Sequence, residues 1–217
     1  MTRSGSEVIS VGLIKDFVNQ TRKPEGRLGK LMLSSMNTGH AKLADWGLAH
    51  LPEIMPEKAV DLGWGAGRNA GELLKKYPRA HVTAVDYSAL SVEKAKEYNR
   101  KMVDAGRCDV LQGDVSELDL PDATFDLATA FETIYFWPGP ERSFARVAKV
   151  LKPGGIFLIC NESDGKDAAG TRFEGIIEGM KCYTPEQIEA ALKAAGFSDV
   201  FSDHHPSRPW ITVMARK

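Results

Sequence analysis

The sequence has no long apolar run, few cysteines and almost no excess of charge of either sign. Of its 217 residues, 28 are Lys or Arg and 29 are Asp or Glu, so the formal net charge is −1. That balance leaves no surplus of basic residues to neutralise phosphates, and we expect no nucleic-acid partner. No apolar stretch approaches the ~18 residues that a spanning helix needs, and the polar N-terminus resembles no signal peptide. We therefore expect no membrane insertion.

The cysteines exclude two further classes of protein. Cys108, Cys160 and Cys182 are odd in number and far apart. They fit neither a disulfide framework nor a zinc knuckle, which predicts a reduced, cytoplasmic protein. His, Asp and Glu residues are not clustered at ligand spacing either, so we expect no metal ligands. A chain of this length is expected to form one compact domain overall.

A glycine-rich stretch is the clearest motif that is present. Residues 59–69 read Ala-Val-Asp-Leu-Gly-Trp-Gly-Ala-Gly-Arg-Asn, and a helical pattern follows directly. A strand, a glycine turn and a helix in this order open nucleotide-binding α/β domains. Glycines are needed because a Cβ would keep the backbone away from the ligand and would penalise positive φ.

Two kinds of ligand are compatible with the glycines. Gly65, Gly67 and Ala70 match the dinucleotide fingerprint Gly-x-Gly-x-x-Gly/Ala, so an NAD(P)-dependent oxidoreductase is one alternative. In the other register, Asp61 precedes Gly63, Gly65 and Gly67. A carboxylate at that place is unfavourable beside a pyrophosphate and suits a cationic ligand instead.

Downstream segments indicate a nucleoside and a doubly wound sheet. Asp86 follows an alternating segment about 20 residues after Gly67, the distance expected of a carboxylate that binds a ribose. Residues 125–131 are nearly continuously apolar, as in a central strand buried on both faces. Leu151 to Gly155 read Leu-Lys-Pro-Gly-Gly, and a further apolar strand over residues 156–160 follows. Both NAD and S-adenosylmethionine contain ribose, so Asp86 does not choose between them.

Together these features resemble class I S-adenosylmethionine (SAM)-dependent methyltransferases over residues 58–217. The small-molecule group that includes ubiquinone and menaquinone biosynthesis methyltransferases is the most similar. The resemblance implies an α/β fold with a doubly wound, Rossmann-like seven-stranded sheet. That sheet is mostly parallel with an antiparallel C-terminal strand, for which residues 197–202 and 210–215 are the expected hairpin. It also implies SAM as cofactor and S-adenosyl-L-homocysteine (SAH) as product.

The resemblance also assigns a cofactor site. In the family an acid such as Asp114 meets the adenine, and a residue at the position of Tyr87 packs against it. Position 64 is usually small or Cys, whereas here it is Trp64, which we expect to flank the amino-acid end of the cofactor. The predicted cofactor-binding residues are Asp61, Gly63, Trp64, Gly65, Gly67, Asp86, Tyr87, Asp114, Val115 and Phe131.

The segment after residues 125–131 is expected to face the transferred methyl group, because ligands bind beyond the carboxyl ends of parallel strands. The sulfonium makes that methyl electrophilic, so in-line displacement by a small-molecule acceptor suffices. A general base is needed only when the nucleophile arrives protonated. His40, Glu132 and Tyr135 are the candidates. A SAM-binding protein that transfers no methyl group is the other alternative.

The first part of the chain is predicted to be a helical lid, residues 1–55, on a SAM-binding domain of residues 56–217. One helix is expected over residues 7–21 and a second over residues 37–51. His40 shares the apolar face of the second helix. It is therefore either a hydrogen-bonded core histidine or, with Asn37, part of the active site. Residues 88–105 are predicted to form one helix, capped by Ser88.

Overall fold

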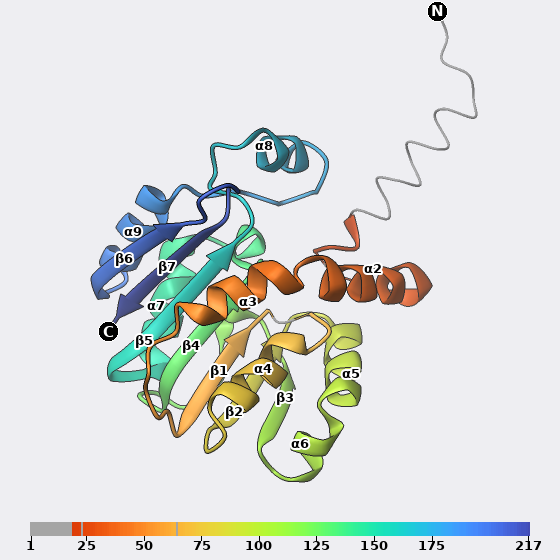
Figure 1. Ribbon diagram of the computed structural model, residues 1–217, viewed down its shortest axis with the longest axis vertical. Helices are drawn as coiled ribbons and strands as arrows, with labels where there is room; N and C mark the ends of the chain where they lie inside the picture. Colours follow the sequence, from red (N-terminus) through yellow and green to blue (C-terminus); the bar gives the residue numbers. More distant parts are fainter. Residues whose placement is uncertain (1–18, 23, 64) are drawn as a thin grey trace, which may run out of the picture.

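The computed structural model describes residues 19–22, 24–63 and 65–217, without the side chains of residues 34–38. A sheet of seven strands lies at its centre, in the order β3-β2-β1-β4-β5-β7-β6 (Figure 1). The first five are mutually parallel, and β7 runs antiparallel to both of its neighbours. The strands are β1 (Lys58–Leu62), β2 (His81–Asp86), β3 (Cys108–Gln112), β4 (Phe125–Phe131), β5 (Leu151–Asn161), β6 (Ser198–His204) and β7 (Ile211–Arg216).

Helices cover both faces of this sheet (Figure 1). Apolar side chains of α3, α4 and α5 form one buried cluster with one face of the strands, and those of α7 and α9 form a second cluster with the other face. The helices are α2 (Gly26–Gly39), α3 (Ala41–Ala49), α4 (Arg68–Lys76), α5 (Ala89–Tyr98), α6 (Arg100–Asp104), α7 (Pro140–Val150), α8 (Ala168–Glu174) and α9 (Pro185–Ala194), with short 3-10 turns η1 (Val115–Glu117) and η2 (Ile134–Phe136).

Alternation along the strands divides the core between these two layers. In β4, Leu127 packs toward α3 and α4, whereas Ala128 and Ala130 pack toward α7. Successive side chains of a strand point to opposite faces, so a strand covered on both sides is apolar over most of its length. The predicted doubly wound, mostly parallel sheet with its antiparallel C-terminal strand is confirmed.

Three predicted element boundaries are wrong. The helix expected over 37–51 is two helices, α2 and α3, that meet at His40. The helix expected over 88–105 breaks at Asn99, whose amide donates to the carbonyls of Gly67 and Ala95. The Leu-Lys-Pro-Gly-Gly segment belongs to β5 itself, where it pairs through Leu151 and bulges before Ile156.

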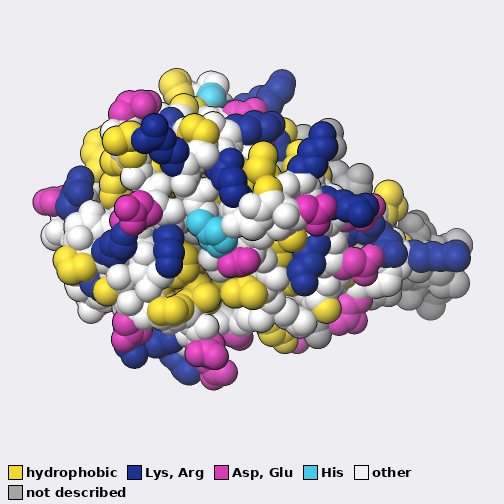
Figure 2. Space-filling model, turned by 90° about the horizontal axis from the view of Figure 1, so that it is seen from below, with side chains coloured by type: hydrophobic (Ala, Val, Ile, Leu, Met, Phe, Trp, Pro, Cys, Tyr) yellow, Lys and Arg dark blue, Asp and Glu magenta, His cyan; other side chains and the backbone are white. Residues whose placement is uncertain are grey.

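The surface agrees with the balanced composition. On the face in Figure 2, acidic and basic side chains are interspersed, and hydrophobic ones form small patches between them. Among the described residues, no helix is long and apolar enough to cross a membrane. Most of the helix expected over residues 7–21 lies outside the described residues, and the division into a lid and a domain at residue 55 stays a prediction.

Candidate functional site

The candidate site lies where the carboxyl ends of the parallel strands meet. The four strands β2, β1, β4 and β5 are consecutive in the sheet, and they end at Asp86, Leu62, Phe131 and Asn161. The residues that follow these ends therefore gather along one edge of the sheet. A cavity of about 300 Å³ opens there.

Most of the predicted site residues line that cavity. The exceptions are Asp61, Gly67 and Tyr135, which lie behind its wall, and Trp64, which lies outside the described residues. The predicted residues on the wall are His40, Gly63, Gly65, Asp86, Tyr87, Asp114, Val115, Phe131 and Glu132.

The glycine turn follows β1 so closely that a side chain has no room. Gly63 has φ +73°, and its N–H donates to the carbonyl of Val85 at 2.7 Å. A Cβ built on Gly63 would lie 1.8 Å from Oγ1 of Thr133 in the loop after β4. Gly67 has φ +97°, and a Cβ there would lie 2.8 Å from the amide nitrogen of Asn99. Glycine is thus required at both ends of the turn.

Asp86 anchors this turn to the end of β2. One of its carboxylate oxygens accepts the Gly65 N–H at 3.0 Å, and the other accepts the Ser88 N–H at 2.8 Å. Burial raises the pKa of Asp86, whereas the two backbone donors act in the opposite direction. Each carboxylate oxygen has a further lone pair, so the group can still accept hydrogen bonds from a ligand in the cavity.

Asp114 is also part of a cap. Its Oδ1 accepts from both the N–H and the hydroxyl of Ser116, at 2.8 and 2.7 Å, and so begins η1. The same residue lines the cavity beside Val115 and Tyr87. Its role as a turn residue is therefore observed, and contact of its other oxygen with an adenine stays a prediction.

Asp61 lies beneath the turn, at 1% exposure. Its Oδ1 accepts from the Thr129 hydroxyl at 2.6 Å, whereas its Oδ2 is buried with no hydrogen-bond partner in the described structure. Burial raises the pKa of Asp61 to about 7. An unpartnered carboxylate oxygen under a positive-φ glycine turn fits a cofactor that brings cationic groups, because a cation nearby would stabilise the charged form.

At the other end of the cavity, a second carboxyl group is held by hydrogen bonds. Glu132 follows β4 with φ +59°, and its Oε1 accepts from the Tyr135 hydroxyl at 2.9 Å and from the Glu162 N–H. Tyr135 in turn accepts from the Ser163 N–H at 3.2 Å. Burial raises the pKa of Glu132 to about 8. Tyr135 thus positions Glu132 and does not itself face the cavity.

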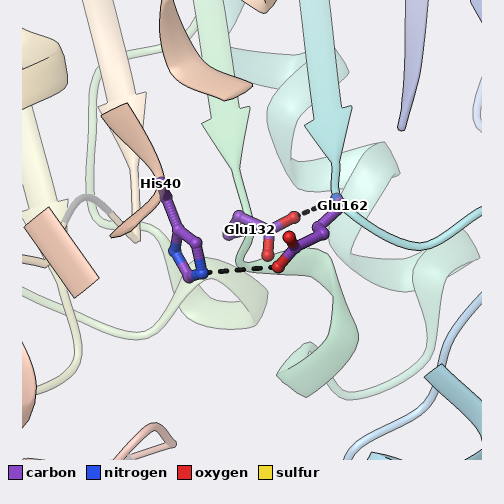
Figure 3. Close-up of side chains that lie close together, drawn as sticks. All are labelled: His40, Glu132 and Glu162. Carbon is purple, nitrogen blue, oxygen red and sulfur yellow. Dashed lines mark hydrogen bonds and ion pairs between the residues drawn. The ribbon is translucent and has the colours of Figure 1, made fainter. Parts of the chain in front are cut away.

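His40 completes this end from the junction of α2 and α3. Its Nε2 lies 3.5 Å from Oε2 of Glu162, which follows the end of β5. Figure 3 shows the three side chains of His40, Glu132 and Glu162 converging from a helix and two strand ends. Burial lowers the pKa of His40, and Glu162 counteracts this shift. His40 is therefore part of this cluster, and its role in the active site stays a prediction.

Helix α2 lies over the glycine turn. Leu33 lines the cavity, and its Cδ2 would lie 3.9 Å from a Cβ on Gly65. The Ser88 hydroxyl donates to the carbonyl of Pro24 at 2.9 Å, which ties the start of α2 to the N-terminus of α5. This placement is compatible with the predicted lid, although the side chain of Asn37 lies outside the described part.

Sequence reasoning missed three residues of this edge: Arg68, Asn99 and Glu162. Arg68 lines the cavity and pairs with Asp45 of α3, with 2.5 Å between the two groups. Glu162 follows the end of β5, so the strand-end rule that led to Glu132 could also have found it. Asn99 gave no signal, because its contact with Gly67 depends on where α5 packs.

Comparisons with known proteins agree with this geometry. Residues 60–159 match a family model described as a methyltransferase domain. A sterol 24-C-methyltransferase of Gibberella zeae is 32% identical over 178 residues, which cover 75% of this chain and 47% of that protein. The chain thus spans about half the length of the curated relatives that it matches.

Solved structures share the fold. A chain from the complex of the Haloferax volcanii Trm112 methyltransferase activator with a methyltransferase superposes with a TM-score of 0.79 at 19% identity, and the match covers 92% of this chain and 96% of that one. Human N-acetylserotonin methyltransferase in complex with SAM gives 0.70 at 22% identity over 85% of this chain and 54% of that one. A methyltransferase domain favours SAM over NAD as the ligand of the glycine turn, whereas the register that begins at Asp61 stays a prediction. The chain therefore carries a class I SAM-dependent methyltransferase domain, whose cofactor is SAM.

Proposed function

We propose that the chain transfers a methyl group from SAM to an apolar small molecule in the cavity at the sheet edge. The observation that carries this proposal is one cavity with two different ends. Asp86 and the glycine turn line one end, and Glu132 with His40 lines the other. A donor and an acceptor can therefore meet inside it, away from bulk water.

The cofactor would lie across the glycine turn. Asp86 would accept hydrogen bonds from the ribose hydroxyls, while Asp114, Val115 and Tyr87 would contact the adenine. Gly63 and Gly65 would allow the backbone to approach the methionine part, with the charge of Asp61 beneath it. SAM supplies an electrophilic methyl group when bound, and the residues of this chain bind and orient it.

Glu132 is the residue we assign to proton transfer. Its Oε1 is held by Tyr135 and the Glu162 N–H, so its Oε2 is left to face an acceptor. Once it is ionised, a carboxyl group with a pKa of about 8 is a stronger base than an exposed glutamate. Glu132 would take the proton of an acceptor that arrives protonated, and Tyr135 would hold Glu132 in place.

The wall of the acceptor end supports an apolar acceptor. Phe131, Phe136 and Trp137 line the cavity beside Glu132. Aromatic walls with a few polar groups are typical of small-molecule pockets. The relatives are named for sterol methylation. We therefore expect an apolar, ring-containing acceptor rather than a small polar one.

We also propose a cytoplasmic location, because the three cysteines are buried and unpaired.

Two measurements test this function. Titration calorimetry with SAH and with NAD should show binding of SAH alone. Incubation with SAM and a panel of apolar acceptors, which includes sterols and quinone precursors, should then release SAH. Binding of SAH without release from any acceptor would favour the alternative of a SAM-binding protein, and binding of NAD but not SAH would contradict the proposal.

A further inference from the structure

Of the cluster of His40, Glu132 and Glu162, the proposed methyl transfer gives a chemical role to Glu132 alone. One imidazole nitrogen and one oxygen from each carboxylate lie within 4.8 Å of one another. The three residues come from the α2–α3 junction and from the ends of β4 and β5, and their side chains converge (Figure 3). From these contacts we propose that the cluster binds a divalent transition-metal ion at the acceptor end of the cavity.

The distances are close to those of a metal site. Zinc bonds to histidine nitrogen and carboxylate oxygen are ~2.0–2.2 Å long, so two ligands of one ion lie about 3–4 Å apart. Nε2 of His40 and Oε2 of Glu162 are already 3.5 Å apart. Side-chain shifts of about 1 Å, within reach of rotamer adjustment, would therefore bring all three atoms onto one ion.

The surrounding contacts orient one ligand. The Tyr135 hydroxyl and the Glu162 N–H both donate to Oε1 of Glu132, and no described residue donates to its Oε2. Ligating carboxylates are held by such outer hydrogen bonds, which fix one oxygen and leave the other for the ion. Tyr135 is itself held by the Ser163 N–H at 3.2 Å, so the support extends beyond the three ligands.

Charge is compatible with a cation at this place. Two carboxylates so close together repel each other unless a proton or a cation lies between them. An organic ammonium group could donate hydrogen bonds to the same three groups, so it is the rival occupant that the test has to include. Histidine with two carboxylates suits Zn²⁺ or Mn²⁺ better than an ammonium.

Three protein ligands would leave coordination positions open toward the cavity. An acceptor oxygen could take one of them, which would place the acceptor next to the cofactor. This role rests on the proposed function, whereas binding of the ion does not. In that case Glu132 would serve the reaction as a ligand and not as a base.

The test uses the full chain after treatment with a chelator. Mn²⁺ is titrated while the electron paramagnetic resonance signal of the free ion is followed, and Zn²⁺ is titrated by calorimetry. We expect one saturable ion per chain. Glu162→Gln and His40→Ala should each weaken binding at least about tenfold. The matched control is His50→Ala. His50 does not line the cavity, and its Nε2 forms a similar pair with Oδ2 of Asp203 at 2.9 Å. This variant should leave binding unchanged.

A second measurement needs no variant. Mn²⁺ should broaden the imidazole resonances of His40 in the wild-type chain well before those of His50. The proposal is overturned if neither ion saturates, if both variants bind as wild type does, or if His50 broadens first. It is also overturned if benzylamine, but neither ion, protects the chain against heat. SAH calorimetry on the same samples tests the proposed function separately. If SAH binds and the metal does not, only the metal-site proposal is overturned.

Discussion

The two ends of the cavity are built in different ways. The glycine turn and the carboxylates of the cofactor end come from a continuous part of the chain, between Asp61 and Val115, and mainly from turns that directly follow strands. The acceptor end joins His40, Glu132 and Glu162, which are far apart in the sequence. The first end is thus determined by local structure, and the second exists only once the sheet and α2 have packed together.

The two ends also treat charge differently. At the cofactor end, the Asp86 carboxylate is satisfied by two backbone N–H groups. At the acceptor end, Glu132 has a carboxylate neighbour and a histidine within reach. Local turns supply backbone donors, whereas tertiary packing is needed to bring like charges together. We therefore expect substitutions at the first end to affect binding and those at the second to affect turnover.

The largest effect is predicted for Glu132→Gln. If Glu132 takes a proton or binds an ion, kcat should fall by about 10²–10⁴-fold, the range for loss of a general base. SAH affinity should stay close to that of wild type, because the cofactor end is untouched. Single-turnover kinetics and SAH calorimetry measure the two quantities. Tyr135→Phe is the control, since it keeps the carboxylate and removes one orienting bond, and its loss should be smaller. A variant with wild-type kcat would contradict the assignment.

A second prediction concerns the pH dependence of stability at the cofactor end. The pKa of Asp61 is about 7 in the folded chain against 3.8 in the unfolded one, so the folded state retains a proton that the unfolded state loses. The contribution of Asp61 to stability is therefore complete below pH 3.8 and is lost as the pH rises through 7. Ionisation of this buried group should cost about 2–3 kcal/mol between pH 5 and pH 8.

Asp61→Asn removes that cost. Relative to wild type, the free energy of unfolding of the variant should rise from pH 5 to pH 8, as measured by urea denaturation without ligand. Asp126→Asn is a useful contrast, because the hydrogen bond from Lys152 helps to hold the Asp126 pKa below its usual value despite partial burial. Asp126 titrates at or below pH 3.8 in both states, so that variant should differ from wild type by a constant amount between pH 5 and pH 8. Parallel pH profiles for wild type and Asp61→Asn would mean that Asp61 is ionised throughout.

The sequence predicted the sheet and the cofactor end because both depend on local patterns. The backbone geometry of the turn and of the strands allows few residue types at these positions. Glycine spacing, apolar runs and strand-end carboxylates such as Asp86 are therefore visible in the sequence. Glu162 was missed because one polar residue after a strand has many uses, and its partner, His40, comes from a helix far away in the sequence. The boundary at His40 was also missed, since apolar periodicity continues across it and the break is visible only in the structure.

A third, smaller effect is predicted within the cofactor end itself. Asp86→Asn keeps an oxygen acceptor but loses the charge, and hydrogen bonds to charged groups contribute ~1.5–3 kcal/mol. SAH affinity should fall about tenfold. Asp114→Asn should have a lesser effect, because Oδ1 of Asp114 already serves as a cap for Ser116. Calorimetry would rank the two. Equal affinities for wild type and Asp86→Asn would mean that the ribose binds elsewhere.

The smallest effect is expected for the local opening of helix α2, which contacts both ends of the cavity. Helix α2 reaches the glycine turn through Leu33, and His40 at its end reaches Glu162. The hydroxyl of Ser88 holds only the start of this helix, through Pro24. A ligand that fills the cavity should therefore add contacts along α2 and slow its local opening.

Hydrogen exchange measured by mass spectrometry, with and without SAH, tests this. Amides over residues 30–51 should exchange several-fold more slowly with SAH, whereas those of β6, on the far edge of the sheet, should be unchanged. Ser88→Ala should weaken the start of α2 and enlarge the ligand-dependent difference, since the helix would then depend more on the cavity. Equal protection with and without SAH would show that α2 is a fixed part of the wall, and the two ends would then share no moving part.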